Sequence, residues 1–156
     1  MRFTEGLHHD VVSTSTAATV GRVEGFVVRP APARIVALRL GKTPTKDTLL
    51  DWSRLSAFGP DAVTVDSMEE LHPAASGVEH DLADSSRDLL GKLALSEAGD
   101  GLGTVTDVEF DPASGAVLTI MTDRQNMAGD QLIGLGEYAA VFAVADPATR
   151  STPNSN

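Results

Sequence analysis

The chain has 156 residues, of which 42% are hydrophobic, and its formal net charge is −10. This length and a mean hydropathy of −0.03 are typical of a globular protein with a core of its own. The absence of cysteine excludes disulfide bonds, thiol nucleophiles and thiolate metal sites, and the negative charge disfavours non-specific binding to nucleic acids or anionic membranes.

The first residues of the chain lack the apolar region of a signal peptide. The longest apolar run, Ala139–Ala145, is far too short to span a bilayer. We therefore expect a cytoplasmic protein without a membrane segment.

The first half of the chain predicts a series of short strands. Val11 is expected on the first strand, and a polar loop follows at 13–19. A hairpin comes next, with strands at about 21–28 and 34–40 around a proline-rich turn. Two further segments are expected after it: a short strand or turn at 49–55, and a closing strand at 62–65.

The same pattern recurs in the second half of the chain, 82 positions later. Four hairpin residues have identical counterparts: Gly21, Val23, Pro30 and Ala31 fall on Gly103, Val105, Pro112 and Ala113. The second turn also has Gly115, which can take the left-handed conformation before the return strand. The same offset places Leu7 on Leu89 and Leu50 on Leu132, and the closing strand 62–65 matches 140–143 after a four-residue gap. The sequence therefore indicates a tandem repeat.

The side-chain alternation of the outgoing strands changes phase at the same place in both repeats. Phe26 and Val28 share one face, whereas Val23 has the opposite parity, and the second repeat shows the same switch. A β-bulge near Gly25 and near Asp107 explains both switches. Bulges of this kind help a short sheet to curl into a barrel.

The return strands are apolar on both faces. Ile35 and Ala37 point to the opposite face from Val36, Leu38 and Leu40, and Val117 and Thr119 are their counterparts in the second repeat. A free-standing sheet prefers polar residues on its outer face. We therefore expect something to cover the face that carries Ile35 and Val117.

Together these patterns predict an all-β fold of two tandem, curled antiparallel sheets packed together, and the family resemblance described next implies that each is a small, highly bent antiparallel β-barrel. The expected divisions are a first repeat at 1–66, an acidic linker at 67–84, a second repeat at 85–145 and a disordered tail at 146–156. Each repeat alone is near the lower size limit for independent folding, so the two are expected to support each other.

The second repeat carries an ordered set of short motifs: Leu89-Leu90-Gly91-Lys92, then Gly103, Val105 and Asp107-Val108, then Asp111-Pro112 and Gly115. This set resembles the PRC-barrel family, which includes the soluble domain of the photosynthetic reaction-centre H subunit and the C-terminal domain of the ribosome-maturation factor. In the first repeat Gly25 replaces the Asp and Ala33 replaces the turn Gly. The resemblance implies a small bent β-barrel that acts as a protein-binding adaptor or assembly module. It implies no catalytic residues.

Two motifs that point to chemistry do not fit their required setting. His8, His9 and Asp10 are adjacent, and neighbouring residues of a strand point to opposite faces, so they cannot easily converge on one metal ion. The segment 134–139 matches a dinucleotide-binding pattern, but it precedes an apparent strand instead of a helix. We predict no catalytic, cofactor-binding or metal-binding residues, and no enzymatic activity.

The segment from Arg22 to Arg54 is basic, with seven Lys or Arg against three Asp or Glu. Trp52 lies in it, and such a residue is either an interface anchor or a half-buried core residue. The basic residues are either a solvated surface or a partner-binding face. The partner-binding candidates are Arg22, Ile35, Arg39, Trp52, Arg54 and Val117.

The leading functional hypothesis is a non-enzymatic adaptor or assembly module that contacts a protein partner or a second copy of itself, with no membrane contact. A second hypothesis is an RNA- or ribosome-associated assembly factor that uses the basic face: Arg22, Arg29, Arg34, Arg39 and Arg54. A third is a small-ligand binder or enzyme with its site in a groove between the barrels.

Overall fold

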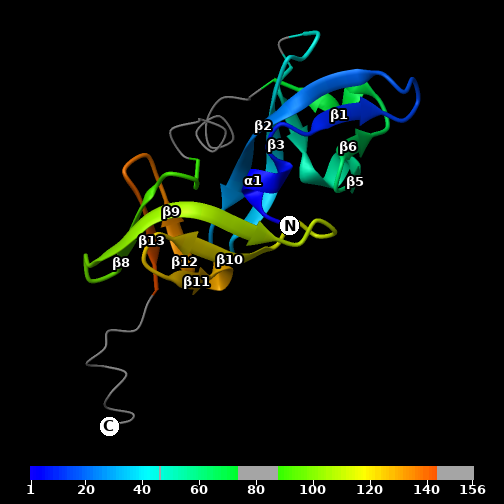
Figure 1. The fold of residues 1–156 in the computed structure, drawn as a ribbon. Coiled ribbons are helices and arrows are strands. Elements are labelled where there is room, and N and C mark those ends of the chain that lie inside the picture. Colours follow the sequence, from blue (N-terminus) through cyan, green and yellow to red (C-terminus); the bar gives the residue numbers. More distant parts are fainter. Residues whose placement is uncertain (46, 74–87, 144–156) are drawn as a thin grey trace.

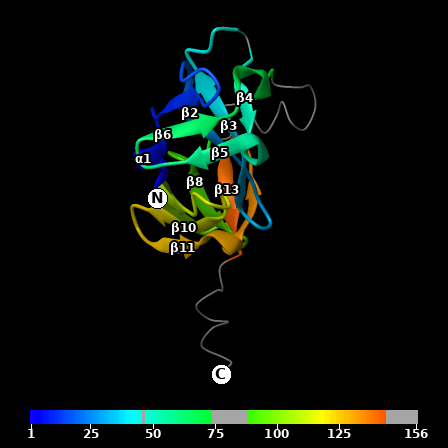
Figure 2. The same cartoon turned by 90° about the vertical axis from the view of Figure 1, so that its right-hand side faces the viewer.

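The computed structural model describes residues 1–45, 47–73 and 88–143. Within them the chain forms one short α-helix and two sheets, of seven and six strands. Each sheet curls into a small, highly bent barrel, and the two barrels lie one above the other in Figure 1 and Figure 2. The all-β fold with two packed barrels, expected from the sequence, is confirmed. No helix in the described ranges has both the length and the apolar character needed to cross a membrane.

The first unit comprises the elements before residue 74. Its helix and strands are α1 (Phe3–Gly6), β1 (Asp10–Ser13), β2 (Thr19–Arg29), β3 (Arg34–Gly41), β4 (Leu49–Asp51), β5 (Leu55–Phe58), β6 (Ala62–Val65) and β7 (Leu71–His72). The 3₁₀ turns η1 (Trp52–Arg54) and η2 (Met68–Glu70) precede β5 and β7. The strand order is β5-β6-β1-β2-β3-β4-β7.

The second unit comprises the described residues from 88 onward. Its elements are β8 (Leu93–Ser96), β9 (Gly101–Phe110), β10 (Val117–Thr122), β11 (Asn126–Ala128), η4 (Gly129–Gln131), β12 (Leu132–Leu135) and β13 (Ala139–Phe142). The strand order is β11-β10-β9-β8-β13-β12. Apart from β7, the two sheets have the same connectivity, and each contains one parallel pair, β1 with β6 and β8 with β13.

The strand registers correct three of the matches expected from the sequence. Leu50 pairs with Leu38 as Met127 pairs with Ile120, so Leu50 corresponds to Met127 and not to Leu132. Ala62 pairs with Asp10, the first residue of β1, and Ala139 pairs with Leu93, the first residue of β8. Ala62 therefore corresponds to Ala139 and not to Ala140. The connection before the fourth strand is shorter in the second unit, so a single offset cannot align the whole chain.

The third correction concerns the residues that lead into each first strand. The backbone N–H of His8 donates to Val23, and that of Gly91 donates to Val105, both at 2.8 Å. Both donors have a left-handed backbone, with φ 71° at His8 and φ 80° at Gly91. His8 therefore corresponds to Gly91, and Leu7 corresponds to Leu90 instead of Leu89.

Two bulges shape each barrel, and the sequence predicted one of them. The register shifts between Val23 and Gly25 in β2, and at the corresponding place between Val105 and Asp107 in β9, as expected. A second shift leaves Val36 in β3 and Leu118 in β10 without direct partners. Because of this bulge, Ile35 lies with Leu38 in the main core, whereas Ala37, which the sequence placed on the face of Ile35, lies in a separate cluster with Val27 and Leu49.

The first residues of β3 and β10 pair with segments of the other unit. Ile35 donates a backbone hydrogen bond to Gly115 at 2.8 Å, and Val117 donates one to Ala33 at 3.1 Å. The two bonds are equivalent, because replacing each residue by its counterpart in the other unit turns one bond into the other. An isolated β-bridge between Arg34 and Ala116 lies between them. A local two-fold relation therefore joins the units, and Ile35 and Val117 are buried in the core that the units share.

One hydrophobic core runs through both units. Phe3 stacks on Phe26 with ring centroids 4.1 Å apart, and Phe110 of the second unit meets Phe26 at 5.5 Å and Phe58 at 5.4 Å. Aromatic pairs at these separations add to the stabilisation from burial. Because this cluster draws on both units, neither unit keeps its core without the other.

The N-terminal segment also joins the units. Met1 and Phe110 exchange two backbone hydrogen bonds, at 2.8 and 3.2 Å. The Thr4 hydroxyl donates to the Asp107 carboxylate at 2.7 Å. Figure 1 places the N-terminus between the two barrels accordingly.

Part of the predicted linker belongs to the first sheet. Ser67 accepts a hydrogen bond from the backbone of Glu69 and caps η2, and β7 pairs with β4. The rest of the predicted linker, residues 74–84, and the predicted tail lie outside the described residues.

Candidate binding groove

A groove with a volume of about 650 Å³ runs between the two units. We call it the Trp52 groove. One wall comes from η1 and β5 of the first unit, and the other from the β9–β10 turn of the second unit. Its lining consists of Trp52, Ser53, Leu55, Ser56, Ala57, Phe58, Pro112, Ala113 and Ser114. The lining is therefore aromatic, apolar and hydroxyl-bearing, as in a surface that recognises another molecule.

The core holds the Trp52 indole from one side. The ring stacks on Phe58 at 5.7 Å and meets Phe110 edge to face at 6.2 Å. Gly115 packs against it so closely that an added Cβ would lie 2.9 Å from Cε2, and its φ of +80° is one that glycine favours. The indole is half-buried and also lines the groove. Of the two roles that the sequence left open, packing on the core is observed, and contact with a partner stays a prediction.

A second hollow, with a volume of about 410 Å³, adjoins the groove. We call it the arginine hollow. It is lined by Arg29, Arg34, Ile35, Val36, Asp51, Trp52 and Ser53. Trp52 and Ser53 line both hollows, so the two meet at the indole.

Arg29 and Arg34 are direct partners in the β2–β3 ladder, and both are exposed. Within the described residues, no carboxylate lies within ion-pair distance of either. Like charges directly opposite each other destabilise a sheet. The chain thus keeps an unfavourable pair of cations beside the half-buried tryptophan.

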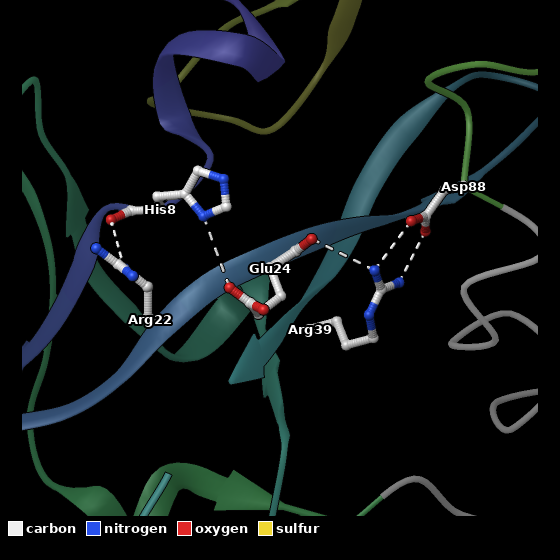
Figure 3. A network of polar contacts seen from close by, with 5 residues as sticks. All are labelled: His8, Arg22, Glu24, Arg39 and Asp88. Carbon is white, nitrogen blue, oxygen red and sulfur yellow. Dashed lines mark hydrogen bonds and ion pairs between the residues drawn. The ribbon is translucent and has the colours of Figure 1, made fainter. Parts of the chain in front are cut away.

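Arg39, a predicted partner-binding residue, is engaged inside the chain. Its guanidinium donates to both carboxylate oxygens of Asp88, at 2.7 and 2.9 Å, and to the Glu24 carbonyl at 3.3 Å (Figure 3). The side chain crosses Gly25 so closely that a Cβ there would lie 2.5 Å from Arg39 Nη2. Gly25 therefore makes room for the ion pair that ties the first barrel to the start of the second unit.

The other predicted residues are dispersed. Arg22 donates to the carbonyl of His8 at 3.2 Å (Figure 3), and Arg54 lies 3.8 Å from a Glu70 oxygen. Ile35 and Val117 are buried in the contact between the units, so a separate partner has no access to their side chains. Among the six predicted residues, Trp52 alone lines both hollows.

Sequence reasoning did not include Arg29 and Arg34 in the binding set, although both belonged to the RNA alternative. Their positions at the two ends of a hairpin turn were a usable signal, because residues that flank a short turn become cross-strand partners. The lack of a nearby carboxylate was not readable from the sequence, because it depends on which distant segments pack there.

The side chains of His8, His9 and His72 contact different partners and do not converge on one point. His8 is exposed and 3.7 Å from Glu24, whereas the His9 ring stacks on Phe58 at 5.7 Å. His72 contacts Asp51 at 2.9 Å. In the ranges that the structure covers, no group of three or more His, Asp or Glu side chains is arranged to hold a metal ion.

No protein-family model matches this sequence. A comparison with curated proteins also finds no match. The PRC-barrel resemblance therefore stays a prediction, and the functional argument depends on the geometry of the Trp52 groove.

Proposed function

We propose that this chain is a non-enzymatic adaptor or assembly module, which binds a segment of a partner protein in the Trp52 groove. The observation that carries this proposal is the position of the indole, packed against Phe58 and Phe110 on one side and lining the groove on the other. Large aromatic side chains held in this way supply much of the binding energy at protein interfaces. We expect the protein to act in the cytoplasm.

The construction of the groove supports this role. Its walls come from both units, and the units share one core and two backbone hydrogen bonds between β3 and β10. A groove whose walls are fixed before binding loses little conformational entropy when a ligand enters. The tandem arrangement is thus a rigid means of presenting a concave surface.

The RNA-binding alternative is less well supported. Three of its five arginines have acceptors within the chain: Arg22, Arg39 and Arg54. The small-ligand alternative would use the same groove, whose volume of about 650 Å³ is within the usual range for such sites. Its open, largely apolar and hydroxyl-bearing walls favour a polypeptide over a reactive small molecule.

A photo-crosslinking experiment in the native host tests the proposal. A photoreactive amino acid is placed at Ser53, which is exposed and lines both hollows, and in a control chain at Glu97, which is exposed in the β8–β9 turn. We expect a discrete crosslinked protein from position 53 that is absent from position 97. The identified partner is then purified, and its binding to the unmodified chain is measured.

A groove-filling substitution provides the second arm. Ser56→Arg places a long side chain in the groove wall without touching the core, and Ala98→Arg is the matched control at an exposed turn residue. We expect Ser56→Arg to abolish binding of the purified partner and Ala98→Arg to preserve it. Equal binding by both variants, or no specific crosslink from position 53, contradicts the proposal.

A further inference from the structure

Strand β5 is an open edge of the first sheet. It stands at the end of the strand order and, among the described residues, pairs with β6 alone. All four of its residues line the Trp52 groove. Proteins usually protect such edges with charges or proline, because an edge presents unpaired backbone N–H and C=O groups. β5 has neither, and its exposed residues are Ser56 and Ala57, although the strand is only four residues long and its pairing with β6 is interrupted by a bulge at Ser56.

The arginine hollow gives this open edge a charged neighbour. Arg29 and Arg34 are held side by side by the β2–β3 ladder, and neither has a carboxylate partner among the described residues. A guanidinium group binds a carboxylate through paired, charge-assisted hydrogen bonds. The pair is therefore suited to an acidic group that a ligand supplies.

The two features form one continuous surface. The Trp52 groove begins at the β5 edge, and it meets the arginine hollow at Trp52 and Ser53. A ligand that extends from β5 toward Arg29 and Arg34 must pass the indole. Along the surface, the β5 edge that can bind a peptide backbone comes first, the Trp52 indole second, and the cations Arg29 and Arg34 last.

From this order we infer that the partner contributes an extended acidic segment, which adds as a strand to the free edge of β5. An apolar side chain of the segment packs on Trp52, and one or more carboxylates bind Arg29 and Arg34. This inference rests on the proposed function, and it specifies the mode of binding and the chemistry of the partner. Strand addition supplies main-chain hydrogen bonds, while the indole and the arginines select the sequence.

The surface favours a peptide over RNA. An open strand edge satisfies peptide N–H and C=O groups, whereas an RNA site needs a longer track of cations along the backbone path. Asp51 also lines the arginine hollow and repels any anion there, a run of phosphates more than a single carboxylate. A single acidic side chain next to an apolar one is sufficient for the two arginines and the indole.

Peptide selection on the whole chain tests the inference. A random library of phage-displayed peptides is selected on the unmodified protein and counter-selected on Ser56→Arg. We expect the enriched peptides to share an apolar residue with Asp or Glu within a few positions on one side of it. Because Trp52 is the only tryptophan of the chain, its fluorescence then measures the affinity of each synthetic peptide directly.

Charge reversal identifies the contribution of the arginines. Arg29→Glu combined with Arg34→Glu is expected to weaken peptide binding about tenfold or more, as the loss of charge-assisted hydrogen bonds predicts. Lys42→Glu combined with Arg124→Glu is the matched control, because it makes the same change in net charge at exposed residues outside both hollows. The control is expected to bind as the unmodified chain does.

Amide hydrogen exchange locates the added strand. The bound peptide is expected to slow exchange along β5 and to leave β12, the corresponding edge of the second sheet, unchanged. Four results overturn the inference: no enriched peptide, enriched peptides without acidic residues, equal binding after arginine reversal, or protection at β12. Displacement of the peptide by a single-stranded RNA dodecamer overturns the inference that the natural ligand is a peptide.

These outcomes separate the inference from the proposed function. If Ser53 crosslinks a partner whose binding survives the arginine reversal, the adaptor role stands and the acidic-strand mode fails. If Ser53 gives no specific crosslink, the adaptor role itself fails.

Discussion

The two units have the same connectivity and the same pair of bulges, yet they differ where the Trp52 groove forms. Following the strand registers, Trp52 corresponds to Gly129. Arg29 and Arg34 correspond to Asp111 and Ala116, which are also direct backbone partners. The second unit therefore has the framework of the first without its aromatic and cationic groups.

Packing explains part of this difference. A Cβ added to Gly129 would collide with the backbone carbonyl of Val117, so no side chain fits there. In the first unit the indole at the same position extends along the contact between the units. The shared elements of the two units thus account for the fold, and their differences mark the surface where we place the function.

The largest predicted effect concerns the core that the units share. Phe110→Ala removes a fully buried ring that contacts Phe3, Phe26 and Phe58. We expect a loss of about 3–5 kcal/mol in the free energy of unfolding. Chemical denaturation followed by Trp52 fluorescence and by circular dichroism should give one coincident transition in the unmodified protein. Two separated transitions would show that the units fold independently.

The next effect tests why the units differ at the position of Trp52. Gly129→Ala is expected to destabilise the protein by about 3 kcal/mol, because the added methyl group meets the Val117 backbone. Gly136→Ala is the control, since a Cβ at that position has no neighbour within 4 Å. Urea denaturation of both variants measures the difference. Equal stability of the two variants would remove the packing explanation.

A smaller effect is expected at the ion pair between Arg39 and Asp88. Arg39→Lys loses the two parallel hydrogen bonds, and because both side chains are partly exposed we expect a cost of about 1 kcal/mol. The corresponding change at Arg54, whose side chain is 63% exposed and 3.8 Å from Glu70, should cost only ~0.3 kcal/mol. Denaturation at low and moderate salt measures both. A larger cost at Arg54 would contradict the structural role given to Arg39.

An effect on stability as small as that at Arg54 is expected for Ser56→Arg in the Trp52 groove. Because Ser56 is exposed, its replacement should change the free energy of unfolding by about 0.5 kcal/mol or less. Its loss of partner binding is then a direct effect of the filled groove. A destabilisation as large as that of Phe110→Ala would show that β5 is not an open edge.

The sequence predicted those features that repeat locally. The parity switch revealed the first bulge, because Val23 and Val105 have the opposite parity to the large apolar residues that follow them in β2 and β9. The second bulge gave no such signal. In β3 the residues on both sides of Val36 are apolar, so a change of phase leaves the pattern unaltered.

The candidate site was less predictable because it depends on contacts between distant segments. The burial of Ile35 and Val117 was expected, but their assignment to an outer face shared with Ala37 and Thr119 was wrong, because a bulge separates the members of each pair. Arg39 was predicted to bind a partner, and its ion pair within the chain was not foreseen because Asp88 lies 49 positions away. Trp52 was identified from its residue type, whereas the open edge of β5 follows from the strand order.

The central claim is that function lies in the residues of the first unit that the second unit lacks. Arg29→Asp combined with Arg34→Ala gives the first unit the residues that the second has at these positions. Titration of this variant with a selected peptide, followed by Trp52 fluorescence, should show a loss of affinity of about tenfold or more with an unchanged unfolding midpoint. Unaltered affinity in the folded variant would contradict the claim.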